Sequence, residues 1–302
     1  VTDEVYRLRV RPLFQWWRQR ELTLSQLYRM YRDCKRGIRE GRAKGLNQPP
    51  KLRTFTRHSD GLLLYPAAET KGLTIGLLTQ TLPHQSPGGV ATYTLELARG
   101  LRDLGCEVHL VYQGRTEDSE LKDGIWYHTA APRETEFSKQ WRGQYGTVAR
   151  NLDYAYGVWR RVVEIDSRWG LDVVESPAWD FEGLFLAHDN RLPLAVRLHS
   201  PLFEVMKIQG WAHTADLDLC IQLEGSLLRH ATAVYGSTSA ILNLVLSHYQ
   251  LRPEVTARIP LGISLEPNAN AASASRVKKI LFVGRLEPRK GIDVLLNALP
   301  AV

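Results

Sequence analysis

The segment from Lys278 to Asp293 carries residue types that could hold a phosphate group. An apolar run ends at Gly284, and Arg285 and Lys290 follow it five residues apart. A strand-to-helix turn exposes unpaired backbone N–H groups, and glycine lets an oxyanion come close to them. Arg285 adds a planar fork of donors, and Lys290 adds a compact charge on a flexible stem. This order favours a diphosphate site over two ordinary solvated charges at a strand end.

A second pair of glycines, Gly88 and Gly89, stands between a predicted strand and a predicted helix. Glycines at the mouth of a helix permit close approach of phosphate or sugar oxygens, because no Cβ intrudes. A simple turn explains the pair equally well when it is taken alone. The GxGxxG fingerprint is absent from the sequence, which argues against a dehydrogenase.

Hydrophobic patterning places these residues on alternating strands and helices. Strands are predicted at residues 73–78, 107–112, 125–128, 172–175, 194–198, 232–235 and 257–259, and helices at 90–104 and 146–168. The alternation is typical of a parallel sheet that helices cover on both faces. His199 then follows a predicted strand at its carboxyl end, the edge at which open α/β sheets bind ligands, although a lone histidine is more often structural.

The composition and the charge distribution argue against several classes of protein. The chain has 302 residues and a net charge of +7, but residues 1–60 hold 15 Lys or Arg against 6 Asp or Glu, and the remainder holds 24 against 26. The basic character belongs to the N-terminal segment, so it does not indicate nucleic-acid binding. The three scattered cysteines suggest neither a zinc site nor disulfides. With no signal-peptide pattern and no apolar run near 18 residues, the sequence predicts a cytoplasmic protein.

Residues 1–70 are expected to form a helical basic extension or the tail of a preceding domain. Residues 22–38 have the apolar stripe of an amphipathic helix. Trp16 and Trp17 stand beside two arginines, a combination that can lie at a membrane surface. Peripheral contact of residues 1–44 with the inner face of a membrane is therefore an alternative to packing against the main domain.

The expected domain boundaries follow from changes in composition. Residues 71–267 are expected to form the first α/β domain, and residues 268–275, rich in Asn, Ala and Ser, a linker. Residues 276–302 are expected to begin a second domain. The chain starts at a valine and stops inside a predicted βα unit, so we expect it to be a piece of a longer polypeptide.

Three motifs, and their order along the chain, resemble those of the retaining glycosyltransferases of family 4, which have the two-domain GT-B fold. They are the "GRL…KG" pattern at residues 284–291, the "GG(V/A)" loop at residues 88–90 and the strand end at His199. The resemblance covers residues 73–300. It implies a Rossmann-like doubly wound parallel sheet as the GT-B N-terminal domain, followed by the first βα unit of a second Rossmann-like domain.

The resemblance implies roles for single residues on the donor side. Arg285, Lys290 and the backbone amides of Gly88 and Gly89 would hold the diphosphate of a nucleotide-sugar donor. His199 would face the donor sugar, and its neutral imidazole could donate to a hydroxyl or accept from one. No general-base role is needed for it.

On the acceptor side, the resemblance implies that Glu175 and Trp179 line the cleft between the domains. Trp179 could stack on a sugar ring, or it could be a partly buried structural aromatic. Asp216 and Asp218 form a DxD, the metal motif of the unrelated GT-A enzymes. They fall in a predicted helix, where residues two apart face different sides, so no metal is expected there.

The resemblance thus predicts a hexosyltransferase-type enzyme that moves a sugar from a nucleoside-diphosphate sugar to a glycan, lipid-linked or small-molecule acceptor, with retention and without a metal or other cofactor. A place in polysaccharide or glycoconjugate synthesis is expected. The family's paired acidic motif belongs beyond residue 302, so the chain by itself is expected to be inactive. Two alternatives stand: a non-catalytic docking or assembly module of a larger envelope-polysaccharide protein, and a GT-B phosphorylase or epimerase.

Overall fold

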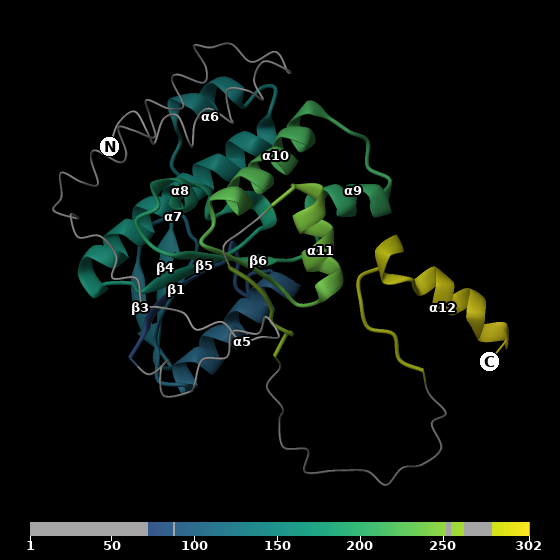
Figure 1. Cartoon of the computed structure of the whole chain (residues 1–302), viewed down its shortest axis with the longest axis horizontal. Helices are drawn as coiled ribbons and strands as arrows, with labels where there is room; N and C mark the ends of the chain where they lie inside the picture. Colours follow the sequence, from purple (N-terminus) through teal and green to yellow (C-terminus); the bar gives the residue numbers. More distant parts are fainter. Residues whose placement is uncertain (1–71, 87, 252–254, 263–279, 302) are drawn as a thin grey trace, which may run out of the picture.

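The computed structural model describes residues 72–86, 88–251, 255–262 and 280–301. The predictions made for residues 1–70 and for the linker at 268–275 lie outside these residues. Within the described part, the chain forms an eight-stranded sheet with helices on both faces (Figure 1). None of the described helices combines the length and the apolar character that crossing a membrane requires.

The strands follow one another in a doubly wound order. They are β1 (Thr74–Leu78), β2 (Glu107–Gln113), β3 (Ser119–Lys122), β4 (Ile125–Ala130), β5 (Val173–Pro177), β6 (Leu194–Leu198), β7 (Ala233–Gly236) and β8 (Val255–Arg258). Their spatial order is β3-β4-β2-β1-β5-β6-β7-β8, and every neighbouring pair is parallel except β3 with β4. The chain builds outward from β1 on one side and then on the other. The switch point, where such sheets bind ligands, therefore lies between β1 and β5.

Two helical layers cover the sheet. The helices α7 (Gly146–Trp169), α8 (Leu184–Asp189) and α10 (Ala215–His230) lie over one face, and α5 (Gly89–Asp103) lies over the other (Figure 1). The remaining described elements are α6 (Glu136–Trp141), η2 (Trp179–Phe181), α9 (Leu202–Gln209), α11 (Ser239–His248), η3 (Pro288–Lys290), α12 (Ile292–Ala298) and η4 (Leu299–Ala301). Because both faces are covered, the central strands are mostly apolar, and the polar residues within them, such as Glu175 and Arg197, are buried.

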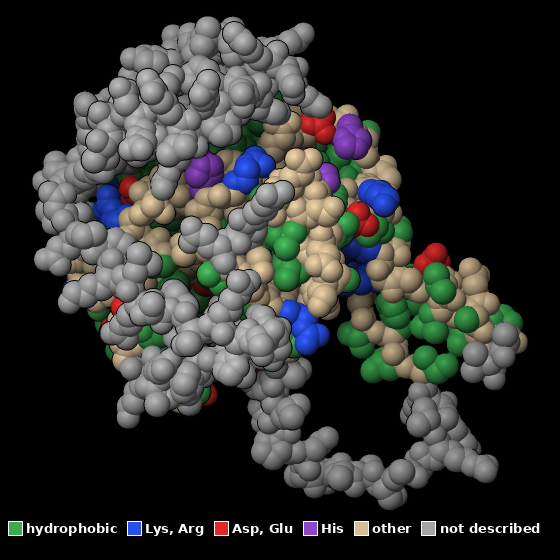
Figure 2. Space-filling model, in the orientation of Figure 1, with side chains coloured by type: hydrophobic (Ala, Val, Ile, Leu, Met, Phe, Trp, Pro, Cys, Tyr) green, Lys and Arg blue, Asp and Glu red, His purple; other side chains and the backbone are tan. Residues whose placement is uncertain are grey.

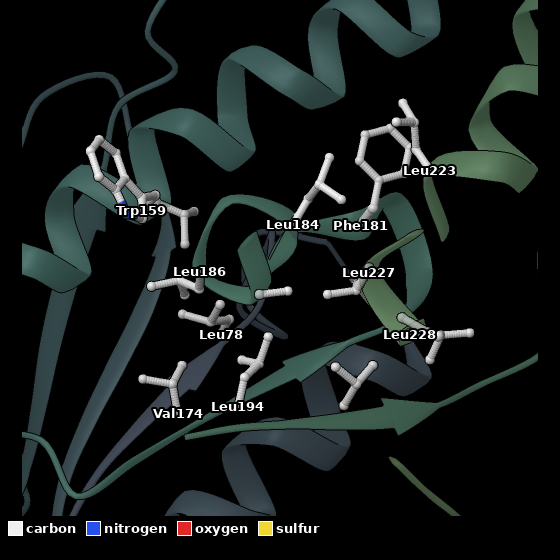
Figure 3. Close-up of a cluster of buried hydrophobic side chains, with 14 of the residues drawn as sticks. Leu78, Trp159, Val174, Phe181, Leu184, Leu186, Leu194, Leu223, Leu227 and Leu228 are labelled. Atoms are coloured by element: carbon white, nitrogen blue, oxygen red, sulfur yellow. The ribbon is translucent and has the colours of Figure 1, made fainter. Parts of the chain in front are cut away.

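The larger core lies between the sheet and the layer of α7, α8 and α10. Its side chains come from the strands and from the helices on that face, and Figure 3 labels Leu78, Trp159, Val174, Phe181, Leu184, Leu186, Leu194, Leu223, Leu227 and Leu228. A second core under α5 contains Leu77, Val108, Leu110 and Ile125. Burying a Leu, Val, Ile or Phe side chain contributes about 1.5–3 kcal/mol, so these two cores are the main source of stability.

The predicted fold class is confirmed: the described chain contains a Rossmann-like doubly wound sheet. The helix predicted at 90–104 is Gly89–Asp103, and the strand predicted at 194–198 is Leu194–Leu198. The antiparallel edge strand β3 was not predicted, because its sequence, Ser-Glu-Leu-Lys, has no buried face to give an apolar pattern.

The strand expected before Gly284 is a wrong prediction. Residues Ile280–Val283 form no strand, and the side chains there are open to solvent, with Leu281 and Val283 both 84% exposed. A strand needs a hydrogen-bonded neighbour, and no described strand pairs with this segment. The helical half of the unit is present as η3 and α12, and Figure 2 shows apolar side chains gathered on the surface of this C-terminal segment.

The DxD of α10 has a structural task. Asp216 accepts hydrogen bonds from the backbone N–H groups of Thr147 (2.9 Å) and Val148 (3.0 Å), the second and third residues of α7. Asp218 faces another way and lies 2.8 Å from His213 Nδ1. Asp216 therefore satisfies two of the unpaired donors at the start of the longest described helix, as a capping side chain does.

A buried pair of histidines stands beside the edge strand. His109 Nδ1 lies 2.9 Å from His128 Nε2, and His128 Nδ1 lies 2.9 Å from the Ser119 hydroxyl. Both rings are fully buried, and both contact Trp169. Burial lowers the pKa of both histidines, and with the neighbouring His109 it lowers the pKa of His128 to about 3. Between about pH 6.5 and pH 3, His128 therefore stays neutral in the folded protein but is protonated in the unfolded chain.

We expect Asp216→Ala to destabilise the protein by about 1–2 kcal/mol, because two N–H groups at the start of α7 lose their acceptor. The matched change Asp218→Ala removes an equal charge from the same helix turn without uncapping α7. Urea unfolding of the two variants measures the difference. Equal losses of stability would show that Asp216 does not cap α7.

We expect the unfolding free energy to fall as the pH drops from about 6.5 toward about 3, because only the unfolded chain protonates His128 in that window. The slope for one histidine is at most about 1.4 kcal/mol per pH unit. His128→Gln should flatten the dependence, whereas His84→Gln at an exposed histidine should not. Urea midpoints measured from pH 7.5 to pH 5 test this, and identical slopes in His128→Gln and the unchanged protein would contradict it.

Candidate functional site

Polar side chains meet at the switch point, where β1 and β5 end. Gln80 follows β1, and its Nε2 donates to Asp180 Oδ2 at 3.0 Å across the gap between the strands. Asn151 of α7 donates to the other carboxylate oxygen at 2.9 Å. Asp180 has φ of 57°, a left-handed conformation that is uncommon for a residue other than glycine. Burial raises the pKa of Asp180, and the two amide hydrogen bonds oppose this rise.

Arg197 of β6 forms the centre of a buried network beside the switch point. It is 1% exposed, and its Nη1 lies 3.2 Å from Glu175 Oε1 on β5, at ion-pair distance but without a well-directed hydrogen bond. Its Nη2 donates to Thr94 of α5 at 2.9 Å, and its Nε donates to His199 Nε2 at 2.8 Å. The guanidinium carbon lies 4.3 Å from the ring centroid of Tyr93. One side chain thus connects two strands, a helix and the loop after β6.

Glu175 belongs to this network and faces inward. Its Oε1 also accepts a hydrogen bond from the Tyr235 hydroxyl of β7 at 3.0 Å. Burial raises the pKa of Glu175, while Arg197 and the Tyr235 hydroxyl favour the carboxylate. In the described residues the Glu175 carboxylate contacts Arg197 and the Tyr235 hydroxyl. Its predicted role in lining the acceptor cleft stays a prediction.

A second buried carboxyl group stands near Arg197. Glu182 is buried, and its Oε2 has no hydrogen-bond partner among the described residues. Burial raises the pKa of Glu182 well above its ordinary value, and the nearby Asp180 raises it further. Burial and the charge of Asp180 thus both disfavour the carboxylate form of Glu182, because a buried charge is costly unless it is paired.

His199 directly follows β6 at the same edge of the sheet. Its ring is partly buried and meets Tyr93 edge-on, with 6.5 Å between the ring centroids. Burial, and then the charge of Arg197, lower the pKa of His199 to about 3. The imidazole is therefore uncharged at neutral pH. Its predicted contact with a ligand stays a prediction.

The glycine turn opens α5 at this edge. Gly88 is the N-cap in an extended conformation and offers no side-chain cap, and Gly89 is the first helical residue. A Cβ on either glycine would meet no atom within 4 Å. Packing of the described residues therefore does not require glycine at either position, and the first N–H groups of the helix have no partner within the helix. Thr94, one turn farther along α5, links this turn to Arg197.

Trp179 begins η2, directly after β5, and is partly buried beside Asp180. The structure therefore brings together the glycine turn, His199, Glu175 and Trp179 at the carboxyl edge of one sheet. Sequence reasoning missed Arg197 and Asp180. A charge within the buried run Leu-Ala-Val-Arg-Leu was a signal for Arg197, because a buried cation needs partners.

The predicted diphosphate residues of the C-terminal segment lie on a different element. Arg285 is 73% exposed at its side chain, and its Nε lies 2.6 Å from Glu287 Oε1. Gln209 of α9 donates to Glu287 Oε2 at 3.3 Å, which attaches this segment to the helix that follows His199. Lys290 is exposed, and Gly291 has φ of 67°, which favours glycine. The described contacts join these cations to α9 and not to the glycine turn of α5.

Within the described residues, no three His, Cys, Asp or Glu side chains gather where they could share a metal ion.

We expect Arg197→Met to destabilise the protein by about 3–5 kcal/mol, because it leaves Glu175 buried without its cation. The double change Arg197→Met with Glu175→Gln should recover part of that loss, because no uncompensated charge remains. A double-mutant cycle from urea unfolding at pH 7.5 measures the coupling. Strictly additive losses would contradict the pairing.

Comparison with known proteins gives a family for the chain. Residues 87–267 match the family described as Glycosyltransferase Family 4. No curated protein matches the chain.

Solved structures are similar at low identity. A sucrose-phosphate synthase from Thermosynechococcus elongatus is 14% identical with a TM-score of 0.46, over 62% of this chain and 48% of that one. Medicago truncatula UGT71G1 complexed with UDP-glucose is 9% identical with a TM-score of 0.43, over 64% and 52%. The catalytic domain of starch synthase IV from Arabidopsis thaliana is 13% identical with a TM-score of 0.38, over 64% and 52%. The chain thus spans about half the length of these proteins.

Proposed function

The chain belongs to glycosyltransferase family 4, and from this membership we propose that the full-length protein transfers a hexosyl group from a nucleoside-diphosphate sugar to an acceptor. The match over residues 87–267 is the observation that carries the proposal. The site supports it, because a helix N-terminus with no side-chain cap and a neutral imidazole lie at the carboxyl edge of a doubly wound sheet.

Each proposed role uses the chemistry of the residue. The first-turn N–H groups at Gly88 and Gly89, together with Arg285 and Lys290, stabilise the charge that develops on the departing nucleoside diphosphate. His199 contacts the donor sugar, and Trp179 at the end of β5 faces the acceptor. The two carboxylate oxygens of Asp216 already hold the start of α7, so we propose transfer that uses no DxD-bound metal. We also propose retention of the anomeric configuration.

We expect Arg285→Ala and Lys290→Ala each to weaken binding of a nucleoside diphosphate by about tenfold or more, because each removes a charged hydrogen bond to phosphate. Isothermal titration of the full-length protein with UDP, ADP and GDP gives the affinities. Lys122→Ala removes an exposed cation at the far edge of the sheet and should leave binding unchanged. Unaltered affinity in both site variants would refute the diphosphate role.

Turnover separates the proposal from its alternatives. Release of nucleoside diphosphate from a UDP-, ADP- or GDP-sugar should require an acceptor and should persist in EDTA. Glycan, lipid-linked and small-molecule acceptors are compared in the same assay. Rearrangement of the donor without acceptor would indicate an epimerase. A requirement for inorganic phosphate would indicate a phosphorylase. Neither binding nor turnover of any donor would favour a docking module.

A further inference from the structure

The contact between Arg197 and His199 determines where the imidazole carries its proton. Arg197 Nε always bears a hydrogen, and it lies 2.8 Å from His199 Nε2. Nε2 must therefore accept this hydrogen bond with its lone pair. In a neutral ring the single N–H then has to be on Nδ1.

An imidazolium at this position would set two donors against each other. A hydrogen on Nε2 would point at Arg197 Nε–H, and the two positive charges would repel. Burial and the charge of Arg197 act in the same direction and lower the pKa of His199 to about 3. Geometry and electrostatics therefore agree that the ring is neutral and that Nε2 is occupied.

Arg197 is itself held from three sides. Glu175 lies at Nη1, Thr94 accepts from Nη2, and Tyr93 lies under the guanidinium plane. A guanidinium fixed in its plane directs its Nε–H along one line, so the His199 ring is oriented by a side chain that has little freedom to rotate. Among the described residues no acceptor is assigned to His199 Nδ1, and this atom is not among the fully buried unsatisfied atoms.

We infer that Arg197 is a positioning residue that holds His199 in the Nδ1–H tautomer, so that the ring presents a hydrogen-bond donor to the ligand. The identity of that ligand as a donor sugar rests on the proposed function. The atom that faces Nδ1 must offer a lone pair, as a sugar hydroxyl oxygen does. Because the Nε2 lone pair is committed to Arg197, His199 does not act as a general base.

The tautomer can be observed directly. A long-range ¹H–¹⁵N correlation spectrum distinguishes Nδ1–H, Nε2–H and imidazolium forms, and His199→Gln identifies the signals by their loss. We expect the Nδ1–H pattern at pH 7, although free histidine favours Nε2–H. An Nε2–H pattern or an imidazolium would overturn the inference.

A pair of variants tests the part played by Arg197. The double change Arg197→Met with Glu175→Gln removes the donor without leaving a buried charge, and it should shift His199 toward Nε2–H. Glu175→Gln alone keeps Arg197 Nε and should keep the Nδ1–H pattern. Arg161→Met makes the same substitution at another buried arginine and should also keep it. Retention of Nδ1–H in the double variant would show that Arg197 does not set the tautomer.

The spectrum needs no turnover, so the two proposals fail separately. A protein with Nδ1–H at His199 and no transfer with any donor would refute the proposed function and leave the positioning role of Arg197 intact. An active transferase with Nε2–H at His199 would do the reverse.

Discussion

The buried charge of Arg197 is the constraint on which the site depends. A cation inside a sheet costs several kcal/mol unless partners surround it, and this chain supplies them from β5, α5 and the loop after β6. The guanidinium that pairs with Glu175 also donates to His199 Nε2 and to Thr94, which belongs to the helix that begins at the glycine turn. A stability requirement and a geometric requirement are met by one set of contacts.

The electrostatics around Arg197 limit what the edge of the sheet can do. Burial disfavours the charged form of Glu182, the His199 imidazole is neutral, and the charge of Glu175 is paired with Arg197, so the network carries little uncompensated charge. A neutral, donor-rich edge suits a polar ligand that carries its own negative charge elsewhere. The cations that would meet such a charge, Arg285 and Lys290, lie on an exposed segment attached to α9 through Glu287.

Sequence patterns predicted more of the fold than of the contacts within the site. Strands such as Leu194–Leu198 were predictable because parallel strands buried on both faces read as apolar runs. The edge strand Ser119–Lys122 was not, because its exposed residues carry no such pattern, and the strand expected before Gly284 failed because a local pattern says nothing about a pairing partner. Asp216 was placed correctly on a helix, but its bond to the start of α7, 68 residues away, was beyond any local pattern.

The sequence by itself determined the fold class, the order of its elements, the strand end that His199 follows and the helix start at the glycine turn, because these follow from local periodicity and from the rule that parallel strands end at one edge. Only the tertiary structure decided that Arg197 joins them, that His199 has its Nε2 occupied, and that Glu175 faces inward. Thr94 and Arg197 are 103 residues apart, and contacts at that separation are selected by packing and by the cost of leaving a buried charge unpaired.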